Sequence, residues 1–224
     1  MVRKILVPLD GSPLAERAIP IAAALAGVTG STIRLIRAVR TRRLPGVDAT
    51  DDELAGMAAA EAYLDARATE LARQGGAAET SAVFAPPTAA ILEEAGQADA
   101  GMIVMATHGR GQLGRWIMGS TAREVLRAAP VPVLLVRAWH AHRAVERIGP
   151  GARIVVPLDG SNTAEGALPV AERLAAALHG QLVLVQAVPP TDPALTPDGM
   201  AVALFHEEAG ARLGPLPREG LRGL

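Results

Sequence analysis

The sequence of 224 residues contains no cysteine, a single lysine and few aromatic residues. Because disulfides, thiolate nucleophiles and cysteine-ligated metals all need cysteine, these three kinds of chemistry are excluded. The lysine, Lys4, does not follow a glycine-rich loop, so the Gly-x4-Gly-Lys-Ser/Thr phosphate loop is excluded as well. These absences remove thiol catalysis and one large class of nucleotide hydrolases.

The sequence also lacks an excess of charge and a long hydrophobic run. Its 22 Lys and Arg residues against 23 Asp and Glu residues give a formal net charge of −1. Surfaces that bind nucleic acid usually carry a basic excess, so nucleic acid is not expected as the main partner. No run approaches the roughly eighteen apolar residues of a membrane span, and the start has no signal-peptide pattern. We therefore expect a cytoplasmic protein without a membrane partner.

Half of the residues are apolar, enough for one sizeable domain and part of another. Short apolar runs, typical of strands buried on both faces of a parallel sheet, alternate with helical patterns. The expected strands are residues 3–8, 32–39, 80–84, 102–106 and 131–136. This alternation predicts an α/β fold with a doubly wound, five-stranded parallel sheet of the Rossmann-like kind.

Helical patterns separate these strands. Residues 51–73 predict a long helix and residues 87–95 a shorter one. Ser12 and Pro13 are typical of a helix start, and apolar residues follow them at helical spacing. Because Pro20 lies inside this pattern, the first helix is either kinked or begins later.

The most informative stretch covers residues 102–136. A strand pattern ends at Ala106, a glycine-rich loop follows, and Gly119 with Ser120 opens a helical pattern that Pro130 ends. Glycines let the backbone turn sharply and approach a ligand closely, and amides at a helix N-terminus point at an anion. This order of elements predicts a phosphate-binding loop.

The glycine spacing in this stretch resembles the ATP-binding signature of the universal stress protein family, Gly-x2-Gly-x9-Gly-Ser/Thr. Gly109, Gly119 and Ser120 match its second glycine, its third glycine and the hydroxyl residue. Ala106 replaces the first glycine, and a positive φ there would strain a residue that carries a Cβ atom. The resemblance implies an ATP-binding protein that acts as a stress-response sensor or regulator.

The resemblance also implies an ATP site, with or without Mg²⁺, at the carboxyl ends of the strands. It places Pro8, Leu9, Asp10, Ala38 and Val39 on the adenine and ribose side, and Ala106, Thr107, His108, Gly109, Arg110, Gly111, Gly119, Ser120 and Thr121 on the phosphate side. Asp10 suits a ribose hydroxyl because a carboxylate accepts two hydrogen bonds, and aspartate also favours turns. The ribose role is slightly favoured, because the phosphate loop lies in the same domain. Ser120 can be the helix N-cap, a phosphate ligand, or both.

Several ionisable residues near these segments have a functional and a plainer interpretation. A basic run comprises Arg34, Arg37, Arg40, Arg42 and Arg43. Its last members leave the second strand at the ligand end, where they either meet a triphosphate or, more commonly, form a solvated loop. His108 has no visible nucleophile or carboxylate partner, so we do not assign it as a catalytic base. His140 and His142 lack a third ligand and predict no metal site.

Residues 7–12, Val-Pro-Leu-Asp-Gly-Ser, recur unchanged as residues 156–161, and further identities continue at the same offset. This internal duplication predicts a first domain at 1–138, a linker at 139–151 and a second domain at 152–224. Tandem pairs of this kind agree with the family resemblance.

The second copy is incomplete, because it has no counterpart of the three later strands or of the glycine signature. After residue 188 we expect a proline-rich loop, a helix at about 200–213 and a tail. A strand–helix–strand unit buries too little apolar surface to stand alone. We expect it to lean on the first domain or on another chain, or to stay loose.

Pro130 and Pro132 flank the start of the fifth strand, and proline cannot donate to a strand ladder. This predicts an edge strand whose apolar run, residues 131–136, needs a cover. Since the family resemblance implies pairing at this strand, we expect a homodimer formed through it.

The sequence leaves more than one function open. The preferred function is an ATP-binding sensor with an unidentified protein partner and at most slow ATP hydrolysis, because no dedicated catalytic set is visible. A family member that binds no nucleotide and acts through interactions is the alternative, kept open by Ala106 and the short second copy. A nucleotidyl- or phosphoryl-transfer enzyme is less favoured, since the sequence has neither a Ser-Gly-Gly loop nor a His-x-Gly-His motif.

Overall fold

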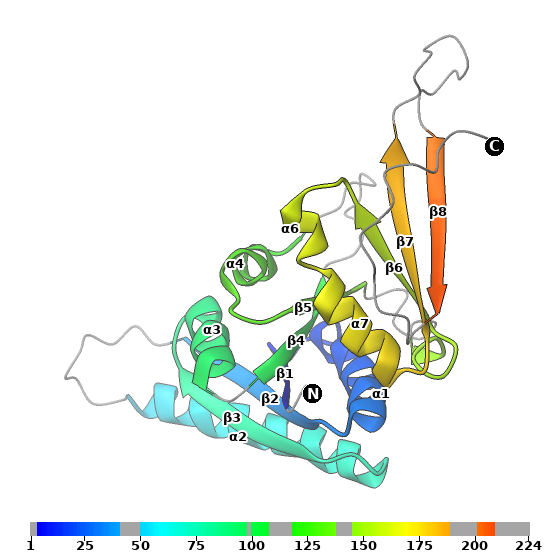
Figure 1. The fold of residues 1–224 in the computed structure, drawn as a ribbon. Helices are drawn as coiled ribbons and strands as arrows, with labels where there is room; N and C mark the ends of the chain where they lie inside the picture. Colours follow the sequence, from blue (N-terminus) through cyan, green and yellow to red (C-terminus); the bar gives the residue numbers. More distant parts are fainter. Residues whose placement is uncertain are drawn as a thin grey trace. The chain divides into compact units, whose positions relative to one another are not determined.

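The computed structural model describes residues 4–40, 50–97, 100–107, 118–137 and 145–186, together with the backbone of residues 187–188 and 201–208. The chain divides into two compact units, unit 1 (Met1–Gly149) and unit 2 (Pro150–Leu224) (Figure 1). The boundary between them falls inside the expected linker, of which residues 139–144 lie outside the described residues. In the described ranges, no helix combines the length and the apolar character that crossing a membrane requires.

The sheet of unit 1 has five strands in the order β3-β2-β1-β4-β5, and every neighbouring pair is parallel. The strands are β1 (Lys4–Pro8), β2 (Thr32–Val39), β3 (Ala78–Phe84), β4 (Ala100–Thr107) and β5 (Val133–Arg137). The winding reverses between β1 and β4, so the predicted doubly wound parallel sheet is confirmed. β5 lies at an edge of the sheet, as the two prolines that precede it predict.

Helices connect the strands of unit 1. They are α1 (Ile19–Thr29), which follows the 3-10 helix η1 (Ala15–Ala18), α2 (Asp51–Arg73), α3 (Pro87–Gln97) and α4 (Ser120–Ala128). Pro20 lies in the first turn of α1, where its missing N–H is not needed, so this helix begins late. α2 begins at a capping box in which the backbone N–H of Glu53 donates to Thr50 Oγ1 and that of Thr50 to the Glu53 carboxylate.

The helices cover both faces of the unit 1 sheet. Side chains alternate along β1, so Leu6 points to the face where α3 and α4 pack, in one cluster with Ile36 and Met105. Ile5 and Val7 point to the other face, on which α1 and α2 contact the strands (Figure 1). All three side chains of this stretch of β1 are at most 1% exposed, as a strand covered on both faces requires.

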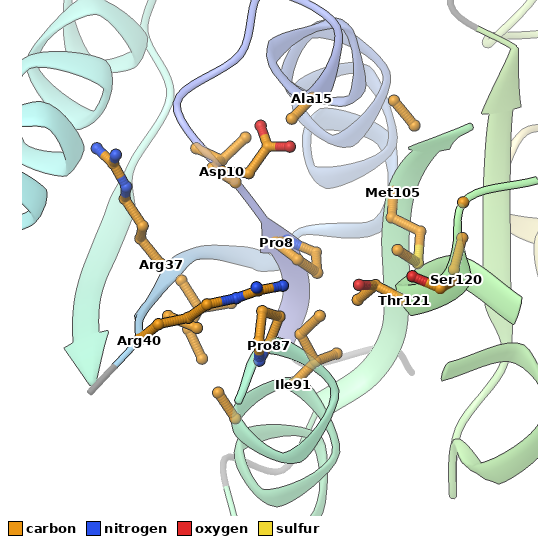
Figure 2. Close-up of a pocket in the computed structure, with 17 residues that line it drawn as sticks. Pro8, Asp10, Ala15, Arg37, Arg40, Pro87, Ile91, Met105, Ser120 and Thr121 are labelled. Atoms are coloured by element: carbon orange, nitrogen blue, oxygen red, sulfur yellow. The ribbon is translucent and has the colours of Figure 1, made fainter. Parts of the chain in front are cut away.

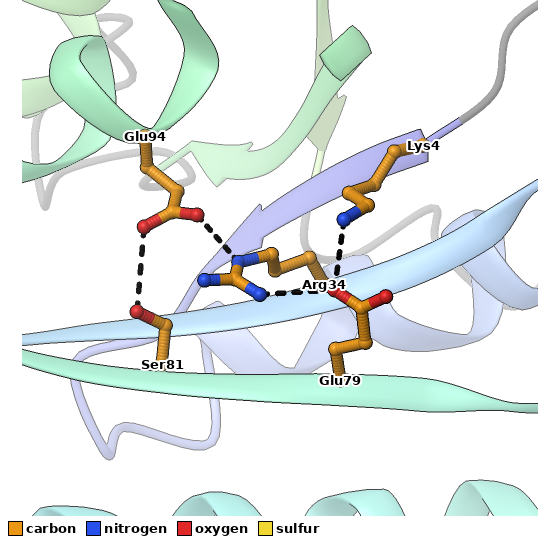
Figure 3. A network of polar contacts seen from close by, with 5 residues as sticks. All are labelled: Lys4, Arg34, Glu79, Ser81 and Glu94. Atoms are coloured by element: carbon orange, nitrogen blue, oxygen red, sulfur yellow. Dashed lines mark hydrogen bonds and ion pairs between the residues drawn. The ribbon is translucent and has the colours of Figure 1, made fainter. Parts of the chain in front are cut away.

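A polar network joins the amino-terminal halves of β1, β2 and β3 to α3 (Figure 3). The Arg34 guanidinium lies 2.9 Å from the Glu79 carboxylate and 2.5 Å from that of Glu94. Lys4 Nζ donates to Glu79 at 2.8 Å, and Ser81 Oγ donates to Glu94 at 3.3 Å. Hydrogen bonds from Lys4 and Arg34 lower the pKa of Glu79 below its ordinary value.

Unit 2 has a sheet of three strands in the order β6-β7-β8. Its elements are β6 (Arg153–Leu158), α6 (Asn162–Glu165), α7 (Leu168–Ala177), β7 (Gln181–Val188) and β8 (Ala201–Glu208). β6 and β7 pair in parallel, whereas β7 and β8 are antiparallel. α7 packs on one face of the sheet through a small cluster that includes Val156, Ala171 and Leu184.

The predicted helix at about 200–213 is wrong over residues 201–208, which form β8. The free edge of β7 offers a row of backbone partners, and all eight residues of β8 pair with it. Long-range pairing of this kind overrides local propensity.

Candidate functional site

A cavity of about 400 Å³ lies in unit 1, where the carboxyl ends of β1, β2 and β4 meet the start of α4 (Figure 2). This is the point at which the winding of the sheet reverses, and open α/β sheets bind their ligands there. The cavity has the size of a site for a small ligand.

Most of the predicted binding residues within the described ranges line this cavity. They are Pro8, Leu9, Asp10, Ala38, Ala106, Gly119, Ser120 and Thr121. Val39 does not, because it points to the opposite face of the sheet, where its side chain lies beside Gly56 of α2. Thr107 is buried, and its Oγ1 donates to the backbone oxygen of Val136 in β5. The sequence thus identified the wall formed by β1, β2 and α4, but not which strand residues face it.

Other predicted residues lie outside the described residues. They are His108, Gly109, Arg110 and Gly111 of the loop, Arg42 and Arg43 of the basic run, and the two histidines His140 and His142. Their roles stay predictions.

The cavity also has lining residues that the sequence did not single out. They are Ala15, Ile36, Pro87, Ala90, Ile91, Met105 and Ala122. Arg37 and Arg40, both members of the predicted basic run, line the cavity as well. Ile36 could have been found from strand periodicity, because it shares a face with Ala38. The residues of α3 carried no such signal, since only the packed fold brings that helix to this edge.

The walls of the cavity differ in character. β2 and the start of α3 form an apolar wall from Ile36, Ala38, Pro87 and Ile91, which suits a flat apolar group. Across the cavity, the hydroxyl groups of Ser120 and Thr121 point inward from the first turn of α4, as Figure 2 shows. One side therefore suits a base and the other suits a polar or anionic group.

The turn after β1 holds Asp10 in place. Asp10 Oδ1 accepts a hydrogen bond from the backbone N–H of Ser12 at 2.8 Å, and Ser12 Oγ accepts one from Ala15 at 3.1 Å. Gly11 between them has φ +88°, a conformation that suits glycine. The turn role of Asp10 is therefore observed, and it leaves the carboxyl group at the cavity wall.

The Arg37 side chain packs between this turn and Tyr63 of α2. Its guanidinium packs against Gly11, where an added Cβ atom would come within 3.0 Å of Nη2, and lies 4.8 Å from the centre of the Tyr63 ring. Tyr63 in turn donates to Glu16 at 2.9 Å, and Arg67 pairs with the same carboxylate at 3.3 Å. Burial, together with the hydrogen bond to Glu16, raises the pKa of Tyr63.

Ala106 continues β4, in register with Val136 of β5. Its φ is not positive, because His179 is the one non-glycine residue with a positive φ in the described ranges. The alanine at the first position of the glycine signature therefore lines the cavity without backbone strain.

Gly119, rather than Ser120, is the N-cap of α4, so the predicted N-cap is wrong by one residue. A glycine N-cap has no side chain to satisfy the first amides of the helix. The amino end of α4 therefore presents backbone N–H groups and the positive end of its dipole to the cavity. Within the described part of the chain, no group of three or more His, Asp or Glu side chains could hold a metal ion.

Comparison with models of known protein families shows the family to which this chain belongs. The model of the universal stress protein family matches residues 1–137 and 152–213, which together are most of the chain. The chain belongs to the universal stress protein family. The match over both segments confirms the family prediction and fits the partial repeat.

Curated universal stress proteins are similar to parts of this chain. One from Thermus aquaticus is 34% identical over 141 residues, which cover 61% of this chain and 100% of the relative. One from Mycobacterium tuberculosis is 32% identical over 105 residues, which are 47% of this chain but 34% of that longer relative. The chain therefore spans about a third of the mycobacterial relative that it matches.

Solved universal stress proteins share the fold. One from Archaeoglobus fulgidus superposes over 61% of this chain and 100% of its own, with 26% identity and a TM-score of 0.50. A second from that organism covers 85% of this chain and 69% of its own, with 21% identity and a TM-score of 0.69. A third, solved in complex with cAMP, covers 61% and 98%, with 26% identity and a TM-score of 0.50.

Proposed function

We propose that unit 1 binds ATP, and that this universal stress protein acts as a nucleotide-dependent sensor or regulator rather than as a dedicated catalyst. One observation carries the proposal: an apolar wall, a carboxylate and a helix N-terminus converge on one cavity at the point where the winding of the sheet reverses. The family relationship and the cAMP complex of a similar structure support a nucleotide as the ligand.

Each group in the cavity has a role in this proposal. Adenine lies against Ile36, Ala38 and the start of α3, with the backbone of Ala38 near its polar edge. The Asp10 carboxylate accepts hydrogen bonds from the ribose hydroxyl groups. The backbone amides of the first turn of α4, with the hydroxyl groups of Ser120 and Thr121, hold the phosphates. Mg²⁺, where present, is held by the phosphates themselves and needs few protein ligands.

Nucleotide content and affinity test the proposal. The purified protein is denatured and its released nucleotides are separated, and the emptied protein is titrated with ATP by calorimetry. We expect ATP to bind the parent protein and to be lost in Gly119→Val, because a branched side chain at the N-cap intrudes on the phosphate subsite. Gly149→Val is the matched control, since an added Cβ atom there meets nothing within 4 Å.

The binding experiment distinguishes the proposed function from an interaction protein, and an ATP turnover assay distinguishes it from an enzyme. Absence of binding to the parent protein would favour an interaction protein without nucleotide, with the methyl group of Ala106 narrowing the phosphate side. Turnover of ATP at rates typical of enzymes would favour a transferase or hydrolase. We expect at most slow hydrolysis, since no nucleophile–base pair lines the described part of the cavity.

We also propose that two copies of the chain pair through residues 131–136 in the cytoplasm, with a further protein partner that reads the bound state. Val133, Leu134 and Leu135 of β5 are only partly buried at the edge of the unit 1 sheet. Unpaired apolar edges of this kind favour strand pairing. Light scattering at micromolar concentration checks this, and a monodisperse monomer would contradict it.

A further inference from the structure

We infer that Arg40 is the specificity-determining residue of the unit 1 cavity, and that it selects ligands by the negative charge they carry beyond the nucleoside. This inference rests on the proposed nucleotide site and names the group that would make it a site for nucleotides rather than nucleosides. Arg40 directly follows β2 and lines the cavity. Figure 2 shows its side chain crossing the cavity from β2 toward Thr121 and Ser120.

The charges around the cavity single out Arg40. Among the described lining residues, the charged side chains are Asp10, Arg37 and Arg40. Arg37 is held against Gly11 and the Tyr63 ring, and in Figure 2 it points away from the group of residues around Thr121. Arg40 is exposed, and no ion pair joins it to an acidic residue in the described ranges. Its charge is therefore available to a ligand.

Two sources of positive potential thus face each other across the cavity. The amino end of α4 offers backbone N–H groups, and Arg40 offers a planar guanidinium that can donate two parallel hydrogen bonds to a phosphate. A phosphate between them would be bound from both sides. Adenosine carries no phosphate, so its affinity would not depend on the amino end of α4 or on Arg40. Arg40 could instead stack on the base, and in that case adenosine and ATP would depend on it equally.

The test uses the chain of 224 residues and its variant Arg40→Met, which keeps the aliphatic stem and removes the charge. Calorimetry gives the affinities for ATP, AMP and adenosine at low and at high salt. We expect Arg40→Met to weaken ATP binding on the order of tenfold or more and to leave adenosine unchanged. We expect the salt dependence of ATP affinity to decrease as well, because one screened charge pair is lost.

Two further variants control for fold and for net charge. Arg127→Met removes one positive charge from exposed Arg127 in the last turn of α4, outside the cavity, and should leave all three affinities unchanged. Arg40→Lys keeps the charge without the paired donors, so it should recover part of the loss for ATP.

The outcomes separate this inference from the proposed function. ATP binding that survives in Arg40→Met would overturn the role of Arg40 and leave the nucleotide site standing. Equal losses for adenosine and ATP, or an equal loss in Arg127→Met, would also overturn charge selection. A parent protein that binds neither ATP nor adenosine would overturn both proposals together.

Discussion

Unit 1 and unit 2 contain the same six-residue turn, Val-Pro-Leu-Asp-Gly-Ser, and fold it in the same way. Asp159 Oδ1 accepts from the N–H of Ser161 at 2.9 Å, and Ser161 Oγ accepts from Ala164 at 3.2 Å, each within 0.1 Å of its counterpart in unit 1. Gly160 has φ +83° where Gly11 has +88°. The turn is thus a local structure that six residues specify by themselves.

The surroundings of the turn differ between the units. In unit 1, β1 lies between β2 and β4, whereas the described strands of unit 2 give β6 one neighbour. Leu6 of β1 is fully buried, but Val155 at the same position of β6 is 58% exposed. The cavity needs β4, α3 and α4, and these have no counterpart in the described part of unit 2. A turn that carries an aspartate is therefore not by itself a binding site.

The comparison also explains why Asp10 alone was an ambiguous signal. Hydrogen bonds from Ser161 lower the pKa of Asp159, so the carboxylate form is favoured by the turn without any ligand. Ribose binding by Asp10 would be a second use of a group that the turn already requires.

The largest expected difference between the units concerns the core. Leu6→Ala should lower the free energy of unfolding by about 2–5 kcal/mol, because a fully buried leucine leaves a cavity. Val155→Ala, at the matching position, should change it by less than about 0.5 kcal/mol, since this side chain is exposed. Urea unfolding followed by circular dichroism measures both, and similar losses would show that a partner covers Val155.

A smaller difference is expected at the glycine of the turn. Both Gly11→Ala and Gly160→Ala place a Cβ atom at positive φ, which costs roughly 1–2 kcal/mol. In Gly11→Ala the new Cβ atom would also lie 3.0 Å from Nη2 of Arg37, which is too close for an undisturbed contact. In Gly160→Ala the nearest atom to the new Cβ would be Nε2 of Gln186, 4.0 Å away. Gly11→Ala should therefore destabilise more and weaken ATP binding. Restoration of stability by Arg37→Gln in the Gly11→Ala background would support crowding as the cause.

The fold was largely predictable from the sequence, for reasons visible in particular residues. β1 and β2 are buried on both faces, so their apolar runs marked them within one residue, and the helical pattern of residues 51–73 predicted the bounds of α2. β8 was not predictable, because its strand state depends on the edge of β7. In the site, Asp10 and Ser120 had local signals, and Arg40 had one as a member of the basic run at the end of β2, whereas Ile91 lines the cavity only through the packing of β2 against α3.

Replacement of the aspartate in each turn would separate its two roles. Asn keeps the side-chain oxygen that accepts from the residue two positions on, so Asp10→Asn and Asp159→Asn should both keep the turn and the stability. ATP affinity should fall about tenfold in Asp10→Asn, because the charged acceptor for ribose is lost, and stay unchanged in Asp159→Asn. Calorimetric titration measures this, and unchanged affinity in Asp10→Asn would restrict this residue to the turn.

The smallest effect concerns the polar network of the unit 1 sheet, at the end away from the cavity (Figure 3). In unit 2 the position of Arg34 is taken by Val183, which is 1% exposed, so one unit has an ion-paired arginine where the other has a buried valine. Glu79→Gln in unit 1 removes both ion pairs of Glu79 and should destabilise by no more than about 1 kcal/mol at pH 7, because this side chain is 46% exposed.

The pH dependence of this variant identifies the cause. The pKa of Glu79 is lowered in the folded protein, so its contribution to stability is complete above the ordinary value of 4.5 and is lost as the pH falls through the lower folded value. The difference in free energy of unfolding between the parent protein and Glu79→Gln should therefore shrink below about pH 4.5. Denaturant unfolding at pH 7 and at successive acidic values measures it. A difference that stays constant with pH would assign the effect to packing, because only the ionised carboxylate can pair with Lys4 and Arg34.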